Sequence, residues 1–185
     1  MNNSSKLLLV TGVGPGTGSA IVRYFASHGY RVAMMARNEK RLQELVKMIP
    51  GTSAFPCDVT DIDRLTTQLS LIEQDHGSPD VLIHNAVGGA FGSFMDIEPA
   101  VLERNFQVNT MALLHLARWL GPAMIERGSG SILATGNTSA YRGKAGFAGF
   151  APTKAAQRIL LESMARSLGP EGIHVAYCAI DAVID

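Results

Sequence analysis

Short apolar runs alternate along the chain with longer segments in which apolar residues recur at helical spacing. Leu7-Leu8-Leu9-Val10 has no polar alternation, which is typical of a strand covered on both faces. Glycine or Pro-Gly ends most of the longer segments, and Asn38 and Asp61 can cap two of them. The pattern predicts strands at 7–10, 30–36, 53–57, 81–83, 131–135 and 174–180, and helices at 19–28, 38–48, 61–76, 99–120 and 152–168.

This order of elements predicts an α/β fold. Strand and helix alternate five times before a last strand ends the series, which argues for a parallel sheet with helices on both faces. Right-handed crossovers make such a sheet doubly wound. We therefore expect a three-layer Rossmann fold of about six strands in the order 3-2-1-4-5-6. Residues 1–185 should form one domain, since the sequence contains no internal repeat, low-complexity tract or linker.

Composition and charge exclude several classes of protein. Hydrophobic residues make up 46% and charged residues 17%, which argues against global disorder. Basic and acidic residues both number 16, so the balance gives no support for a nucleic-acid partner or an acidic membrane surface. No apolar run reaches the roughly 20 residues of a membrane span, and the run at 7–10 is too short for a signal peptide. We expect a soluble, cytoplasmic protein.

The two cysteines do not indicate a metal site. Cys57 and Cys178 are far apart in the sequence, and no pair of histidines near them completes a ligand cluster. Both lie in apolar, strand-like segments. We interpret them as small buried hydrophobic residues of a reducing compartment, and we expect no bound metal.

A glycine-rich turn follows the first predicted strand and opens the first predicted helix. It reads Thr11-Gly12-Val13-Gly14-Pro15-Gly16-Thr17-Gly18. Glycines permit a tight turn and let the backbone approach a pyrophosphate, whose charge meets free N–H groups and the positive end of the helix dipole. The strand–turn–helix context supports a dinucleotide site. The alternative is a turn that needs glycines for its geometry alone.

The end of the second strand bears on which dinucleotide is bound. Folds that prefer NAD usually carry an acidic residue there to hold the ribose hydroxyl. This chain has Ala36 in that place, followed by Arg37. A guanidinium can bind a 2′-phosphate with two hydrogen bonds, which favours NADP over NAD. The alternative is that Arg37 is a solvated surface charge.

Several separate motifs together resemble the short-chain dehydrogenase/reductase family over nearly the whole chain. Besides the glycine turn, they are Cys57-Asp58-Val59, His84-Asn85-Ala86-Val87, Asn109 and Lys154-Ala155. The resemblance implies an NAD(P)-dependent oxidoreductase that transfers hydride between a nicotinamide and a small carbonyl or alcohol substrate. The cofactor-binding residues it implies are Gly12, Gly14, Gly16, Thr17, Gly18, Arg37, Asp58, Val59, Asn85, Ala86 and Lys154.

The chain departs from the family pattern at the residues that handle the substrate. The family places a tyrosine four residues before the lysine and a serine 13 residues before that tyrosine. These positions hold Phe150 and Asn137, and Val87 replaces a loop glycine. The pattern resembles an atypical subgroup with Phe in place of the tyrosine. It implies a degenerate catalytic set of Asn109, Asn137, Lys154 and Phe150.

These departures leave the activity open. Phenylalanine has no proton to donate, and a positioned acid is worth about 10²- to 10⁴-fold in rate. Asn137 could still hydrogen-bond a carbonyl oxygen. Tyr141 could swing in as a replacement acid, or could pack on the helix beneath it, while His84 reads mainly as a buried, hydrogen-bonded histidine. The alternative to an enzyme is a catalytically silent NADP-binding protein with a regulatory or scaffold role.

Two further expectations concern the rest of the fold. Family members continue beyond the sixth strand, so the resemblance implies that the C-terminal part of the family fold is missing here and that a sheet edge is exposed. The segments 99–120 and 152–168 carry apolar residues on more than one face. That pattern indicates a homodimer or tetramer formed through these helices, or ordinary packing against the sheet.

Overall fold

The computed structural model describes residues 5–181. Its strands are β1 (Leu7–Thr11), β2 (Arg31–Ala36), β3 (Thr52–Pro56), β4 (Val81–His84), β5 (Gly130–Asn137) and β6 (Ile173–Ile180). Its helices are α1 (Thr17–Ser27), α2 (Glu39–Met48), α3 (Ile62–His76), α4 (Pro99–Phe106), α5 (Ala112–Arg127) and α6 (Ala151–Leu168). Three short turns complete the chain: the π-helical η1 (Gln107–Met111) and the 3-10 turns η2 (Thr138–Tyr141) and η3 (Gly169–Glu171).

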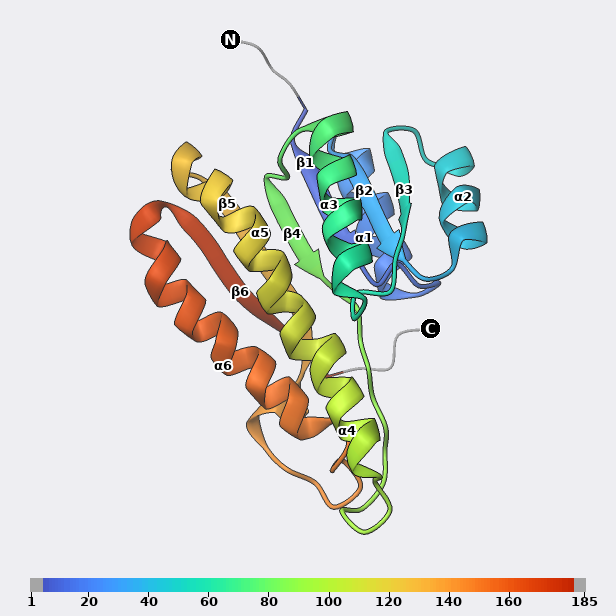
Figure 1. The fold of residues 1–185 in the computed structure, drawn as a ribbon, viewed down its shortest axis with the longest axis vertical. Coiled ribbons are helices and arrows are strands. Elements are labelled where there is room, and N and C mark those ends of the chain that lie inside the picture. Colours follow the sequence, from blue (N-terminus) through green and yellow to red (C-terminus); the bar gives the residue numbers. More distant parts are fainter. Residues whose placement is uncertain (1–4, 182–185) are drawn as a thin grey trace.

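The strands form one parallel sheet in the order β3-β2-β1-β4-β5-β6 (Figure 1). In the register of the central strand, Leu9 lies opposite Ala33 of β2 and Leu82 of β4. The chain reverses its direction of travel across the sheet after β3, which places a switch point between β1 and β4. The predicted Rossmann fold and strand order are confirmed.

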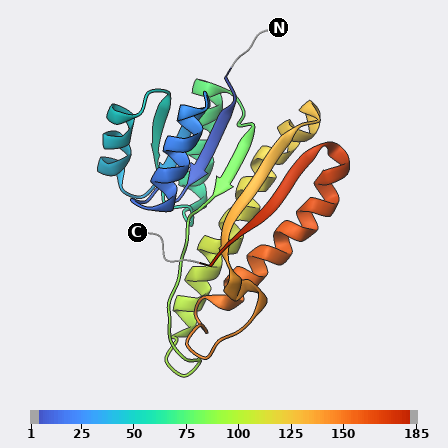
Figure 2. The ribbon, with the colours of Figure 1, turned by 180° about the vertical axis from the view of Figure 1, so that it is seen from behind.

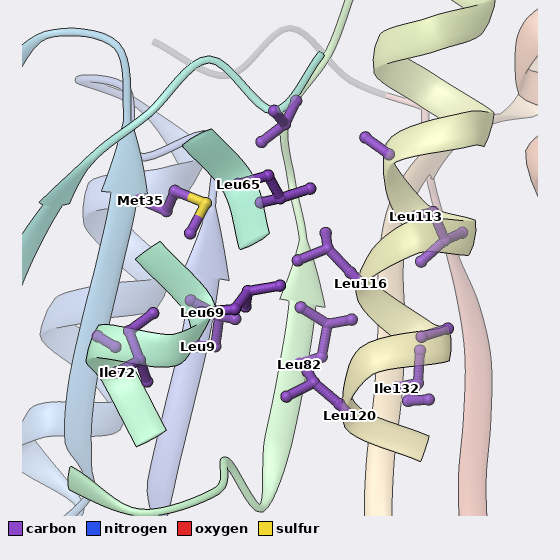
Figure 3. Close-up of a cluster of buried hydrophobic side chains, with 14 of the residues drawn as sticks. Leu9, Met35, Leu65, Leu69, Ile72, Leu82, Leu113, Leu116, Leu120 and Ile132 are labelled. Carbon is purple, nitrogen blue, oxygen red and sulfur yellow. The ribbon is translucent and has the colours of Figure 1, made fainter. Parts of the chain in front are cut away.

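The sheet separates two hydrophobic cores. Alternate residues of β1 point to opposite faces, so Leu9 packs with α3 and α5 while Leu8 packs with α1 and α2. Figure 3 shows the first core, where Leu69 of α3 and Leu116 of α5 meet Leu9 and Leu82. Because both faces of β1 are covered, every one of its residues is buried, which explains its unbroken apolar run.

The helix boundaries follow local chemistry with one exception. Asn38 and Asp61 cap α2 and α3 as predicted, since their Oδ1 atoms accept hydrogen bonds from Arg41 N (3.0 Å) and Arg64 N (3.1 Å). The predicted end of the long helix near Leu120 is wrong. Helix α5 continues through Pro122 to Arg127, because the buried side chains of α5 hold this segment against the sheet beyond the proline.

The expectation that both cysteines are buried is half wrong. Cys57 is 2% exposed, whereas Cys178 is exposed. Strand β6 lies at the edge of the sheet, and α6 covers only one of its faces. Figure 2 views the opposite face, where no helix of residues 5–181 covers β5 and β6. Within the same residues, no helix has the length and apolar character needed to cross a membrane.

Candidate functional site

A cavity of about 750 Å³ opens at the carboxyl ends of the strands, where ligands bind in doubly wound sheets. Its walls come from the loops after β1, β2, β3 and β4, the last residues of β5, the end of α4 and the first turn of α6. All the cofactor-binding residues expected from the sequence line this cavity, as do Asn137 and Phe150; the one predicted site residue that does not line it is Asn109.

The glycine turn is packed tightly against the loop that follows β4. Gly12 has φ +76°, and a Cβ atom built on it would lie 2.3 Å from Ala86 N. A Cβ on Gly18 would lie 2.6 Å from Gly12 O. The side chain of Asn85 secures this arrangement, since its Nδ2 donates to Gly12 O at 2.7 Å. The turn therefore requires glycine at these two positions for conformation and close approach.

The first turn of α1 has the properties of an anion site. Its N-cap is Gly16, no side chain caps it, and its first turn contains no acidic residue. In α2 and α3, by contrast, a side-chain oxygen occupies this place. Gly14, Gly16, Thr17 and Gly18 all line the cavity at the start of α1. The residues present fit the pyrophosphate of a dinucleotide.

Three arginines line the opposite end of the cavity. Arg37, Arg41 and Arg104 line the cavity together with Asp58, whose Oδ2 lies 4.0 Å from Arg104 Nη2. Burial raises the pKa of Asp58, but hydrogen bonds from Thr60 and the nearby arginines outweigh it and hold the pKa below the ordinary value. Arg41 and Arg104 were not among the residues predicted from the sequence. Arg41 lies in the first turn of α2, three residues after the N-cap Asn38, so its place near the end of β2 could have been predicted from the cap.

Lys154 lines the cavity from the first turn of α6. It is 3% exposed, and its Nζ donates to Thr135 O (3.1 Å) and to Gln157 Oε1 (3.0 Å). Burial lowers the pKa of Lys154 to about 8. The ring of Phe150 lies beside the ammonium, with its centroid 5.9 Å from Nζ. Gln157 was not identified from the sequence, because it reads as an ordinary residue of an amphipathic helix.

Asn109 lies behind the cavity wall. Its Oδ1 accepts from Gly88 N (3.0 Å), and its Nδ2 donates to Gly88 O (2.7 Å) and Thr153 Oγ1 (2.8 Å). It thus ties the loop after β4 to α6. Asn109 belongs to the π-helical turn η1, an irregularity that often marks functional sites. Next to Val87, the backbone approaches α4 closely at Gly88, where a Cβ would lie 2.8 Å from Asn105 Oδ1.

Asn137 is held by hydrogen bonds at both ends of its amide. Its Oδ1 accepts from Ser139 N (2.9 Å), and its Nδ2 donates to Ile180 O (2.9 Å). The hydroxyl of Tyr177 accepts from Asn137 N (2.8 Å) and donates to Asn137 O (3.0 Å). Of the two Nδ2 protons, one is left to donate to a ligand. Tyr177 was also missed, because its role depends on the pairing of β5 with β6.

The two side chains considered as replacement acids lie elsewhere. Tyr141 is 61% exposed and does not line the cavity; its ring lies 4.7 Å from the guanidinium carbon of Arg158 on α6. His84 is fully buried and hydrogen-bonded to Thr11 Oγ1 (2.8 Å) and Val108 O (3.0 Å). Desolvation lowers the pKa of His84 to about 3. The interpretation of His84 as a buried, satisfied histidine is confirmed.

Comparison with known proteins assigns the fold and its motifs to a family. The sequence profile described as short chain dehydrogenase matches residues 6–183. The chain belongs to the short-chain dehydrogenase family. It is 32% identical over 176 residues to carbonyl reductase [NADPH] 2 of Sus scrofa, covering 95% of this chain and 70% of that protein.

Solved structures of family members superimpose closely on this chain. A short-chain dehydrogenase from Streptomyces avermitilis has a TM-score of 0.91 at 34% identity, over 96% of this chain and 65% of that one. L-sorbose reductase from Gluconobacter frateurii, complexed with NADPH and L-sorbose, has a TM-score of 0.88 at 26% identity, over 94% and 68% of the two chains. The chain thus spans about two thirds of the length of these relatives.

Proposed function

We propose that this short-chain dehydrogenase binds NADP(H) and transfers hydride between its nicotinamide and a small carbonyl or alcohol compound. The observation that carries the proposal is the single cavity that joins the uncapped start of α1, a group of arginines and Lys154. Its lining includes four cationic side chains and one carboxylate, which suits an anionic dinucleotide: Arg37, Arg41, Arg104, Lys154 and Asp58. The pig carbonyl reductase and the sorbose reductase complex, both named with NADPH, support the same cofactor.

Each region of the cavity has a defined task under this proposal. The amides at the start of α1 bind the pyrophosphate, and Arg37 with Arg41 binds the 2′-phosphate that distinguishes NADP from NAD. Asp58 borders the adenosine, and Lys154 borders the nicotinamide ribose. The bound nicotinamide supplies or accepts the hydride.

Fluorescence titration with NADPH and NADH tests the cofactor assignment. NADPH should bind more tightly than NADH. Arg37→Gln should weaken NADPH binding by about 10- to 100-fold, since a hydrogen-bonded charge pair is worth about 1.5–3 kcal/mol, and should leave NADH binding almost unchanged. Arg118→Gln is the matched control, because Arg118 is exposed on α5 and does not line the cavity. Equal affinity for both dinucleotides would refute the preference for NADP.

A catalytically silent NADP-binding protein is the second candidate, and the observation that favours it is Phe150. This side chain lines the cavity where the family carries its proton-donating tyrosine, and it has no proton to give. Phe150→Tyr and Asn137→Ser, singly and together, should be assayed by NADPH oxidation with a panel of carbonyl compounds. Turnover by the natural protein that Asn137→Ala abolishes argues against the silent role. Turnover that appears only with Phe150→Tyr supports it.

A further inference from the structure

The buried side-chain amide of Gln157 on α6 links Lys154 to the π-helical turn η1. Gln157 is 0% exposed and lies one helical turn after Lys154. Its Oε1 accepts from Lys154 Nζ (3.0 Å), and its Nε2 donates to Asn109 O (2.6 Å). Since an ammonium only donates and a carbonyl only accepts, this amide has one orientation that satisfies both partners. Gln157 therefore fixes the position of the ammonium.

The surroundings of Lys154 hold the ammonium without neutralising its charge. An ammonium has three protons, and two are donated to neutral acceptors, Thr135 O and Gln157 Oε1. Burial is the cause that lowers the pKa of Lys154, and no carboxylate of residues 5–181 opposes it. The titratable neighbour of Lys154 is the buried His84, the last residue of β4. Among residues 5–181, the carboxylate that lines the cavity is Asp58, which follows β3; strands β2 and β1 lie between β3 and β4. The third proton is left for a ligand in the cavity.

We propose that Lys154 donates the proton that Phe150 cannot supply, and that Gln157 is the positioning residue that holds Nζ in place without adding a negative charge. This inference rests on the proposed oxidoreductase function. During reduction, the carbonyl carbon receives hydride from NADPH, an Nζ–H bond of Lys154 breaks and an O–H bond forms on the substrate oxygen. The neutral amine then takes a proton from water. During oxidation, the neutral amine accepts the proton of the alcohol.

The neutral side chain of Gln157 suits a proton-donating lysine, because it holds the ammonium without raising the pKa of Lys154. An acid or base acts best when its pKa lies near the working pH, and Lys154 titrates at about 8. A carboxylate in place of the amide would favour the charged ammonium and raise the pKa by about 1 to 3 units. An apolar side chain would remove a hydrogen bond to the ammonium and lower the pKa further. Substitution in the two directions should therefore move the titration in opposite directions.

The first test measures the pKa of Lys154 by NMR titration of ¹³C-labelled lysine side chains. The chain contains five lysines, and Lys154→Arg identifies the resonance of interest. Gln157→Glu should raise the midpoint by about 1 to 3 pH units, and Gln157→Met should lower it. Gln74→Glu, on the exposed side of α3, is the matched control and should move nothing. If Gln157→Glu does not fold, the direction of the Gln157→Met shift decides.

The second test compares these midpoints with activity. The rate of carbonyl reduction at saturating NADPH should fall as pH rises through the Lys154 midpoint, and this limb should follow the NMR midpoint in each Gln157 variant. An ordinary midpoint near 10.5 for Lys154, or no movement in either variant, overturns the inference. So does turnover of the panel by Phe150→Tyr when the natural protein binds NADPH and turns over nothing. Absence of NADPH binding refutes the proposed function instead, while the NMR titration still judges Gln157.

Discussion

The buried histidine at the end of β4 should make the stability of this protein fall in mild acid. Val108 O can only accept a hydrogen bond, so His84 Nε2 carries the proton and Nδ1 accepts from the Thr11 hydroxyl. Full burial and the nearby charge of Lys154 lower the pKa of His84 from 6.5 to about 3. The folded protein therefore keeps this ring neutral well below the pH at which the unfolded chain protonates it.

The sign and size of the effect follow from proton binding in the two states. Between pH 6.5 and pH 3 the unfolded state binds one more proton, so the free energy of unfolding falls as pH falls. Each pH unit below 6.5 costs about 1.4 kcal/mol, which gives a loss of about 2 kcal/mol between pH 7 and pH 5 from this group alone. Domains of this kind are stable by only about 5–15 kcal/mol, so the loss is measurable.

Urea unfolding at a series of pH values from 5 to 7 provides the assay. His84→Asn should be less stable than the natural protein at pH 7 by about 1–3 kcal/mol, because Thr11 and Val108 lose a buried partner. The free energy of unfolding of His84→Asn should nevertheless depend less steeply on pH, because the slope loses the contribution of one proton, about 1.4 kcal/mol per pH unit. His174→Asn, at an exposed position of β6, should keep the original slope. Identical slopes for the natural protein and His84→Asn would refute the reasoning.

Two further expectations concern local geometry and thiol chemistry. Gly12→Ala should lower the melting temperature through a loss of about 1–3 kcal/mol or more in stability, because an alanine there combines φ +76° with a contact of 2.3 Å to Ala86 N. Gly14→Ala is the control and should leave the melting temperature unchanged, since nothing lies within 4 Å of its Cβ. Equal melting temperatures for the two variants would contradict this packing. A thiol reagent at pH 8 should modify the exposed Cys178 rapidly and Cys57 slowly, because burial raises the pKa of Cys57 to about 11, and Cys178→Ser should remove the fast phase.

The fold was predictable because its signals are local. The unbroken apolar run of β1 follows from burial on both faces, and the caps Asn38 and Asp61 act within three residues of their own positions. The end of α5 was not predictable in this way. Gly121-Pro122 is a strong local stop signal, but the packing of Met124 in the core, which is a tertiary contact, outweighs it.

The cavity, too, has one part that depends on neighbouring residues and another that depends on contacts between distant residues. The part of the cavity at the start of α1 is lined by a few nearly consecutive residues around Gly14, so a local sequence pattern is enough to predict that they lie together. The lysine end depends on contacts between distant positions: Lys154 Nζ with Thr135 O across 19 residues, and Gln157 Nε2 with Asn109 O across 48. No spacing rule relates such residues. Asn109, which the family resemblance placed in the catalytic set, bonds to the loop after β4 and to α6 and does not line the cavity.

The hydrogen-bond network around Lys154 forms without the side chain at position 150. The hydrogen bonds that hold Lys154, Gln157 and Asn109 use no atom of the Phe150 side chain. The network therefore does not need a phenol at position 150 in order to form. Burying a lysine and a glutamine costs free energy unless both are hydrogen-bonded, and here both are. The cavity thus contains a positioned, buried ammonium with one proton available to a ligand, beside Phe150, whose side chain has no proton to donate.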